Sequence, residues 1–153
     1  MFIETANLTD IGALTTLYQA LTTEMHAFQP TNYQEKSSPD FFTWKMMVED
    51  KRQTVYITRN QDQITGFCHI TTAQTSPSNL FISHKFAYVT ALYVHPDYRR
   101  QGIATALLAK TRTWQKEKQL AFLELTVLGN NQSALQLYQK LGFVTQNQTL
   151  RQV

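Results

Sequence analysis

Apolar residues recur along this chain with two different spacings, which separate its helices from its strands. Spacings of three and four residues, as in Ile11, Leu14 and Leu17, predict helices, whereas β-branched and aromatic runs such as "TVYIT" predict strands. The expected order is strand 1–5, helices 11–25 and 40–50, strands 54–58, 64–71 and 86–94, a helix from about residue 102, strand 121–128, a helix ending at Gly142, and a final strand over 144–153.

Two local patterns refine this order. The run "FAYVTALYV" over 86–94 is almost continuously apolar, which predicts a central strand buried on both faces. Thr9 or Asp10 is the expected cap of the first helix. The mixed order of elements predicts an α/β fold, with helices flanking a central mixed sheet, in a single domain spanning 1–153.

Composition fits a folded chain of this kind. The sequence has 153 residues, of which 42% are hydrophobic, so a disordered chain is excluded. Cys68 is the single cysteine and lies in the apolar run "GFCHI", which favours a buried strand residue over a catalytic thiol. The first residues lack the pattern of a signal peptide, and no apolar run approaches the roughly 20 residues of a membrane span. We therefore expect a cytoplasmic protein without a membrane partner.

Positive charge is concentrated in one stretch. The net charge is +3, yet residues 99–118 alone hold six basic residues against Glu117. Nucleic-acid binding is one interpretation of such a stretch. We rank it last because Trp114 is the single aromatic residue there and falls on the predicted buried stripe of the helix, so we expect no nucleic-acid partner.

The stretch "YRRQGIATALL", Tyr98 to Leu108, places one glycine where the helix begins. A helix N-terminus presents unpaired N–H groups and partial positive charge, which suit a phosphate. Gly102 lacks a side chain, so a phosphate can approach its backbone closely. The chain contains neither a P-loop nor a G-x-G-x-x-G fingerprint. An ordinary strand-to-helix turn remains the alternative when this stretch is taken alone.

The surrounding sequence resembles the Gcn5-related N-acetyltransferase superfamily. Val94-His95-Pro96 followed by "RRQGIA" is similar to the family's acetyl-CoA signature. Some thirty residues later, "LELTVLGNNQSALQLYQKLGF" is similar to its second signature, a strand, an Asn, then a helix with Tyr before a Gly-Phe pair. The N-terminal half matches in its order of elements alone.

The resemblance implies a set of acetyl-CoA-binding residues. The end of the central strand would hydrogen-bond the pantetheine arm, and backbone N–H groups from Arg100 to Thr105 would hold the pyrophosphate. The basic side chains of Arg99, Arg100, Lys110 and Arg112 would attract the nucleotide end. The implied set is Leu92, Tyr93, Val94, Arg99, Arg100, Gln101, Gly102, Ile103, Ala104, Thr105, Asn131 and Tyr138.

The implied chemistry is transfer of an acetyl group from acetyl-CoA to a primary amine of a small molecule or protein, by direct attack in a ternary complex and without a metal. Tyr138 would donate a proton to the leaving thiolate, and the N–H of Leu92 or Tyr93 would stabilise the oxyanion. Judged without the family, Tyr138 is more often a packing residue than an acid.

The general base is where the sequence departs from the family. Relatives place carboxylates at two positions where this chain has Thr90 and Thr126. Glu124 and His69 are weaker candidates, and a water chain to solvent would also suffice, so the base stays unassigned. The missing carboxylates motivate an alternative function, a non-catalytic acyl-CoA-binding or regulatory module.

Two further expectations concern partners. The segments expected to hold the acceptor include few acids, chiefly Glu24, Glu35 and Asp40, which argues against a strongly polycationic amine.

Many relatives carry two strands after the last helix, and residues 144–153 provide room for one. The sheet edge would then stay open or be completed by a partner subunit, so a homodimer is possible.

Overall fold

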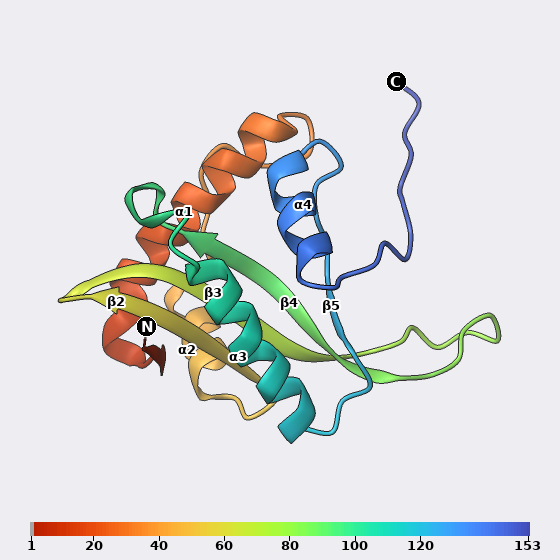
Figure 1. Ribbon diagram of the computed structural model, residues 1–153, viewed down its shortest axis with the longest axis horizontal. Coiled ribbons are helices and arrows are strands. Elements are labelled where there is room, and N and C mark those ends of the chain that lie inside the picture. Colours follow the sequence, from red (N-terminus) through yellow and green to blue (C-terminus); the bar gives the residue numbers. More distant parts are fainter. Residues whose placement is uncertain (1) are drawn as a thin grey trace.

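The computed structural model describes residues 2–153, which form a five-stranded sheet with helices on both faces (Figure 1). Met1, part of the first expected strand, lies outside the described residues. The elements are β1 (Ile3–Thr5), α1 (Ile11–Phe28), α2 (Phe41–Glu49), β2 (Gln53–Asn60), β3 (Gln63–Gln74), β4 (Lys85–Val94), α3 (Ile103–Glu117), β5 (Leu123–Leu125) and α4 (Gln132–Lys140), with 3-10 turns at Leu8–Asp10 and Pro96–Tyr98. The α/β architecture predicted from the sequence is confirmed.

The strands lie in the order β1-β2-β3-β4-β5. Neighbouring strands run antiparallel, except β4 and β5, which run parallel. A parallel pair needs a crossover, and α3 supplies it between these two strands. The β4–β5 pairing begins at Ala87 and Leu123 and ends at Val89 and Leu125. Beyond those residues the two strands part, which opens the sheet between β4 and the edge strand β5.

A β-bulge in β4 lies where this opening begins. The register with β3 shifts so that His69 faces Ala91 while Ile70 faces Val89, which makes Thr90 the extra residue. An extra residue reverses the alternation of side chains. Val89 therefore packs in the core on the α3 side of the sheet, whereas Ala91 packs in the core beneath α1 and α2.

The expectation that strand 86–94 is buried on both faces is wrong. Its odd-numbered members from Ala87 to Tyr93 are buried, but Thr90 is exposed and Leu92 is half-buried. The apolar run reflects a strand that changes core at its bulge and also forms the wall of an opening. A pattern of apolar residues cannot distinguish such a wall from a second buried face.

Two cores hold the helices to the sheet. On one face, Leu14 of α1 and Trp44 of α2 are fully buried against Phe67 of β3. On the other, the predicted stripe of α3 is confirmed, since Leu107 is fully buried with Cys68 beneath it. Burying a side chain of this size stabilises the fold by roughly 1.5–3 kcal/mol.

The start of the first long helix is capped differently from the prediction. The side chain of Asn7 accepts a hydrogen bond from the Thr9 backbone, and the Asp10 carboxylate accepts one from the Asn7 backbone at 2.9 Å. Asp10 makes no cap bond for α1. Its carboxylate instead accepts a hydrogen bond from Arg59 of β2 at 2.6 Å, which ties the helix start to the sheet.

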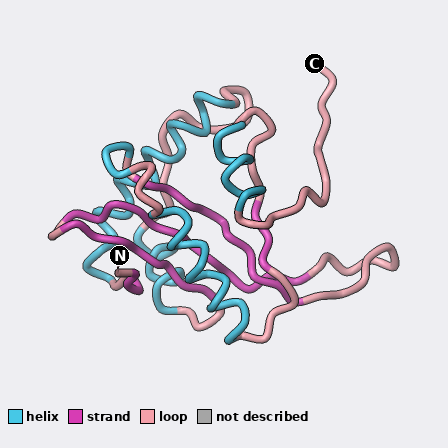
Figure 2. Tube along the Cα trace, in the orientation of Figure 1, coloured by secondary structure: helices cyan, strands magenta, loops and turns pink. Residues whose placement is uncertain are grey.

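The C-terminal part of the sheet is smaller than predicted. The strand expected over 121–128 pairs over Leu123–Leu125 alone, because β4 turns away at its bulge and leaves residues 126–128 without a partner strand. The final strand expected over 144–153 is wrong in the described structure. This segment is extended, fully exposed and outside the sheet, and it leads away from the body of the molecule (Figure 2).

Candidate active site

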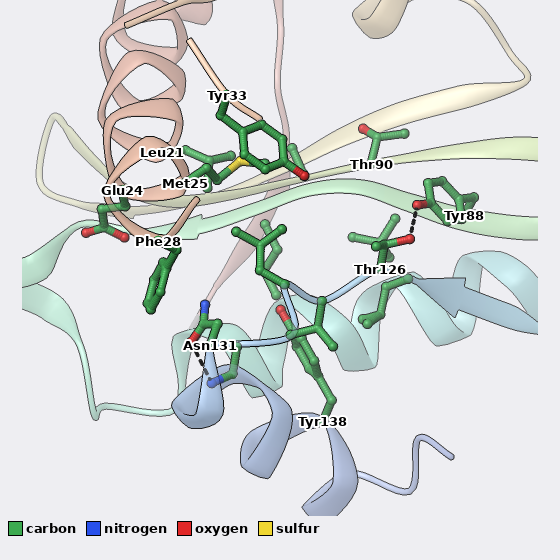
Figure 3. A pocket seen from close by; sticks show the side chains of 17 residues that line it. Leu21, Glu24, Met25, Phe28, Tyr33, Tyr88, Thr90, Thr126, Asn131 and Tyr138 are labelled. Atoms are coloured by element: carbon green, nitrogen blue, oxygen red, sulfur yellow. Dashed lines mark hydrogen bonds between the residues drawn. The ribbon is translucent and has the colours of Figure 1, made fainter. Parts of the chain in front are cut away.

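The parting of β4 from the chain after β5 forms a cavity of about 290 Å³ (Figure 3). Its walls come from α1, the loop after α1, β4, the chain following β5, and α4. The lining residues are Leu21, Glu24, Met25, Phe28, Tyr33, Tyr88, Val89, Thr90, Ala91, Leu92, Leu125, Thr126, Val127, Leu128, Asn131, Ala134 and Tyr138. Of the residues that the resemblance implies, Leu92, Asn131 and Tyr138 line this cavity together.

A hydrogen bond marks the closed end of the opening. The hydroxyl groups of Tyr88 on β4 and Thr126 after β5 lie 2.6 Å apart (Figure 3). The Thr126 hydroxyl is therefore already hydrogen-bonded to Tyr88 on β4. The strands diverge from this point toward the start of α3.

Backbone groups of β4 point into the opening. The N–H of His95 donates to Thr65 on β3 at 2.8 Å, and residues two apart on a strand point the same way. The N–H of Tyr93 is therefore directed to β3. The N–H groups of Leu92 and Val94 face the opposite side, where β5 has moved away, so their backbone is available to a ligand.

The start of α3 presents a row of unpaired donors. Within residues 2–153, the backbone N–H groups from Arg100 to Thr105 have no hydrogen-bond acceptor, and Ala106 is the first to bond back, to the Gly102 carbonyl. Gly102 has φ +81°, and a Cβ placed on it would meet nothing within 4 Å. The glycine allows a left-handed turn and leaves open space before the helix, as an anion site requires.

The side chain of Arg99 is occupied within the chain. Its guanidinium donates to the Glu24 carboxylate at 2.6 Å and to the Val94 carbonyl at 2.9 Å. It also lies over the ring of Tyr93, 5.3 Å from the centroid. Arg99 therefore fastens the end of β4 to α1. The side chain of its neighbour Arg100 is exposed and makes no ion pair among the described residues.

Tyr138 reaches the cavity from α4. Figure 3 shows its hydroxyl directed toward the diverging strands. Burial raises the pKa of this phenol to about 12, so the hydroxyl keeps its proton at neutral pH. Its ring packs edge-on against Phe143, which explains the spacing of Tyr and Phe in the sequence. The geometry therefore places a protonated hydroxyl donor, that of Tyr138, in the cavity.

Asn131 begins the helix that carries Tyr138. Its side-chain oxygen accepts a hydrogen bond from the Ala134 backbone at 3.2 Å, as an N-cap residue does. The neighbouring Asn130 donates to the carbonyl of Phe28 at 2.7 Å. These contacts fix α4 against the end of α1, across the cavity.

A buried histidine lies behind Thr90, and sequence reasoning missed this connection. His69 is 6% exposed, and burial lowers its pKa to about 4, so its ring is neutral. Its Nε2 lies 2.8 Å from the side-chain amide oxygen of Gln53, which can only accept, so that nitrogen carries the proton. The other nitrogen therefore accepts from the Thr90 hydroxyl. The sequence contains both His69 and Thr90, but their contact depends on the β-bulge at Thr90, and no sequence pattern indicates that bulge.

The wall formed by α1 and its following loop is largely apolar. Leu21, Met25 and Phe28 project from the helix, and Tyr33 leans over them from the loop (Figure 3). The loop is held by His26, whose ring lies 2.7 Å from the Tyr33 carbonyl. Glu24 is the one charged lining residue, and it is paired with Arg99.

Other candidates from the sequence lie outside this cavity. Glu124, Lys110 and Arg112 are not among its lining residues. The described residues hold no cluster of three or more metal-ligating side chains. None of the helices in residues 2–153 has the length and apolar character needed to cross a membrane.

The chain is similar to proteins of known family. Over 57 residues, or 37% of this chain, it is 37% identical to an uncharacterized N-acetyltransferase of Methanocaldococcus jannaschii, of which the match covers 25%. The chain spans less than half the length of the curated relatives it matches.

Solved structures share the fold. A mutant of the BH1408 protein from Bacillus halodurans has a TM-score of 0.92 at 21% identity, with 100% of this chain and 99% of that chain covered. An aminoglycoside N-acetyltransferase in complex with CoA has a TM-score of 0.76 at 16% identity, with 99% and 98% covered.

The match to a family model extends through the sheet and the cavity. It covers residues 15–143 and is described as the acetyltransferase (GNAT) family. This range contains β4, α3 and α4, and with them the open β4 backbone, the donors at the start of α3, and Tyr138. The chain therefore belongs to the GNAT family of acetyltransferases.

Proposed function

We propose that this chain is an acetyl-CoA-dependent N-acetyltransferase that acts on a primary amine in a ternary complex. Three groups together carry the proposal. The open backbone of β4 and the protonated hydroxyl of Tyr138 line one cavity, and β4 leads along the chain to the unpaired N–H groups at the start of α3. They offer a strand edge, a proton donor and an anion site.

The residues present fit acetyl-CoA. The N–H groups from Arg100 to Thr105 would hold the pyrophosphate, because the open space before Gly102 lets it approach the backbone. The backbone of Leu92 and Val94 would bind the pantetheine arm in the manner of an added strand. Tyr93 would contribute through its ring, which holds Arg99, rather than through its N–H.

The reaction needs charge stabilisation and two proton movements. The amine attacks the thioester carbonyl, and the N–H of Leu92 would bind the oxygen on which negative charge develops. As the bond from carbon to sulfur breaks, Tyr138 would donate its proton to the thiolate. A phenol whose pKa burial raises to about 12 remains protonated until that step.

The amine must also lose a proton. Glu24 is the one carboxylate of the cavity and is already paired with Arg99. We propose that the proton leaves through water in the open cavity. Thr90 would position the amine, because its hydroxyl donates to His69 and its oxygen can accept an N–H from the substrate.

A second function has its own support. The family resemblance implies a carboxylate base at the position of Thr90 or of Thr126. Neither threonine can act as that base, and Thr126 is hydrogen-bonded to Tyr88. A non-catalytic acyl-CoA-binding module would have the same donors at α3 without turnover. The two functions share a ligand and differ in whether an amine is acetylated.

Calorimetric titration with acetyl-CoA tests the shared part, with ATP as the control ligand. We expect selective binding that Gly102→Glu weakens by at least about tenfold, since a carboxylate would occupy the anion site. Absence of binding by the folded protein would overturn both functions. Acetylation of an amine, lost in Tyr138→Phe while acetyl-CoA still binds, would exclude the non-catalytic module.

A further inference from the structure

The hydroxyl of Thr90, at the wall of the cavity, is hydrogen-bonded to a residue of the neighbouring strand. Thr90 is the extra residue of the β4 bulge, and its exposed side chain lines the cavity (Figure 3). Behind it, the buried ring of His69 on β3 accepts a hydrogen bond from this hydroxyl at Nδ1. The proton of the hydroxyl is therefore engaged, and the lone pairs of its oxygen remain for a group inside the cavity.

The direction of this hydrogen bond depends on Gln53, one strand further from the cavity. Val55 on β2 pairs with His69, and Gln53 lies two residues earlier, on the same face of the sheet. Its amide oxygen lies 2.8 Å from His69 Nε2. Because an amide oxygen only accepts, Nε2 carries the proton and Nδ1 keeps its lone pair. Gln53 thus fixes the tautomer of His69, and His69 fixes where the Thr90 hydroxyl points.

Burial protects this arrangement. His69 is 6% exposed, and both of its ring nitrogens are hydrogen-bonded within the sheet. Burial also lowers the pKa of the ring to about 4, so the neutral form prevails at neutral pH. A protonated ring would donate from both nitrogens and turn the Thr90 hydroxyl toward the cavity. The fold therefore disfavours the state that would reverse the hydrogen bond.

His69 is too weak a base to remove the proton of the amine itself. A general base works best when its pKa lies near the operating pH, and at pH 7 a ring with a pKa of about 4 is protonated in roughly one molecule in a thousand. The ring is also not among the residues that line the cavity. Any effect of His69 on the reaction therefore passes through Thr90, in keeping with release of the proton to water.

An oxygen that only accepts distinguishes the N–H groups of an amine from its lone pair. It binds an N–H and leaves the lone pair free to face the thioester carbonyl, whereas a hydroxyl that donated into the cavity would bind the lone pair and block attack. As the nitrogen bonds to the carbonyl carbon it gains positive charge, so the hydrogen bond to the oxygen becomes charge-assisted. Its contribution therefore grows in the transition state and raises kcat.

We propose that His69 and Gln53 are positioning residues for acetyl transfer, which hold the Thr90 hydroxyl as an acceptor so that its oxygen orients the N–H of the attacking amine. The inference rests on the proposed function and adds to it two residues of β2 and β3 that do not line the cavity. A histidine with a structural role alone would stabilise the sheet without affecting the attack.

A double-mutant cycle tests whether His69 acts through Thr90. With phenethylamine as the acceptor, Thr90→Val and His69→Leu should each lower kcat about 10- to 100-fold, the effect of losing one charge-assisted hydrogen bond. The double variant should be no slower than Thr90→Val alone, because no hydroxyl is left to orient. His84→Leu, on the exposed β3–β4 connection, is the matched control and should keep the activity of the parent.

Conservative replacements separate this role from packing. Thr90→Ser keeps a hydroxyl, and His69→Asn offers an amide oxygen in place of Nδ1, so both should keep kcat within about fivefold of the parent. Calorimetry should find the same dissociation constant for acetyl-CoA in all variants. If His69→Leu does not fold, Gln53→Leu takes its place in the cycle, because Gln53 is half-buried and acts on the same tautomer.

Nitrogen NMR of the His69 ring measures the tautomer without any need for turnover. The parent chain should show the form protonated at Nε2, and Gln53→Leu should lose this preference, because the acceptor at Nε2 is removed. The His69→Asn spectrum assigns the signals by their absence. A parent ring protonated at Nδ1 would overturn the proposal.

The kinetic outcomes distinguish this inference from the proposed function. Additive losses in the double variant, a loss confined to KM, or His69→Asn as slow as His69→Leu would each overturn the positioning role and leave acetyl transfer established. Absence of acetylation by a parent chain that binds acetyl-CoA would instead overturn the proposed function, and this inference with it.

Discussion

At the scale of single residues, Tyr138 makes a prediction about pH. Burial raises its pKa to about 12, so the proton that it would donate is present at every pH below that value. An amine with a pKa of about 10 is deprotonated progressively as the pH rises. We expect kcat/KM to rise toward about pH 10 without a falling limb. A decline that begins near pH 8 would contradict the assignment of Tyr138.

Substitution of the same residue measures its contribution. Tyr138→Phe keeps the ring against Phe143 and removes the hydroxyl. We expect kcat to fall about 10²- to 10⁴-fold while the dissociation constant of acetyl-CoA is unchanged. Steady-state kinetics with calorimetry would measure both. Loss of binding in parallel with turnover would indicate a structural role instead.

His69 makes a prediction about stability. Burial lowers its pKa from 6.5 to about 4, so between these values the unfolded chain binds a proton that the folded chain does not. Stability is therefore full above about pH 6.5 and falls, by up to roughly 3 kcal/mol, as the pH approaches 4. Urea unfolding at several pH values should show a smaller loss for His69→Gln than for His84→Gln.

Cys68 makes a prediction about reactivity. The thiol is fully buried, and burial raises its pKa. A thiol-specific reagent should therefore leave the folded protein unlabelled and modify one cysteine per chain after unfolding. Rapid labelling of the native protein would contradict the buried placement. The result also matters in practice, because the same reagents detect released CoA.

At the scale of elements, the close packing of α3 on the sheet depends on a glycine in β3. A Cβ on Gly66 would lie 2.9 Å from a methyl group of Ile103 and 3.2 Å from the Tyr93 carbonyl. The helix start therefore lies directly on the strand. The donors of α3 keep their position because β3 has no side chain there.

Substitution of this glycine should therefore affect both stability and binding. We expect Gly66→Ala to cost about 1–3 kcal/mol and to weaken acetyl-CoA binding by displacing α3. Gly12→Ala in α1, where a Cβ meets nothing within 4 Å, should stabilise by about 0.5–1 kcal/mol and leave binding unchanged. Denaturant unfolding and calorimetry measure both quantities. An unchanged affinity of Gly66→Ala for acetyl-CoA would show that binding does not depend on the close packing of α3 against Gly66.

The order of elements could be predicted from the sequence where each element carries its own periodic pattern. The stripe of α3 and the hairpin of β2 and β3 are of this kind. The tail 144–153 also has a strand pattern but no partner strand within the described chain. Local pattern specifies what a segment can form, and pairing decides what it does form.

At the scale of the whole molecule, the cavity that we propose receives the amine is nearly neutral. Its wall of Leu21, Met25, Phe28 and Tyr33 surrounds one carboxylate, that of Glu24, which Arg99 already pairs. A polycationic amine would lose water there without gaining opposite charges. An amine with a single charge and an apolar body would bury that body against the wall.

This asymmetry can be measured by competition between acceptors. We expect kcat/KM for phenethylamine to exceed that for the polycationic sisomicin by at least about tenfold. Met25→Asp should reduce the ratio of the two kcat/KM values, because it adds an unpaired carboxylate that can bind a polycationic amine. Preference of the parent chain for sisomicin would contradict an apolar acceptor site while leaving acetyl transfer itself established.

By itself, the sequence determined the α/β order, the glycine at the start of α3 and the spacing of Asn131 and Tyr138, because helix periodicity, backbone freedom and capping are local properties. The tertiary structure decided the rest. The bulge at Thr90 arises from pairing with β3, and it opens the cavity and brings His69 behind Thr90. Pairing and burial join residues far apart in sequence, and no local pattern encodes them.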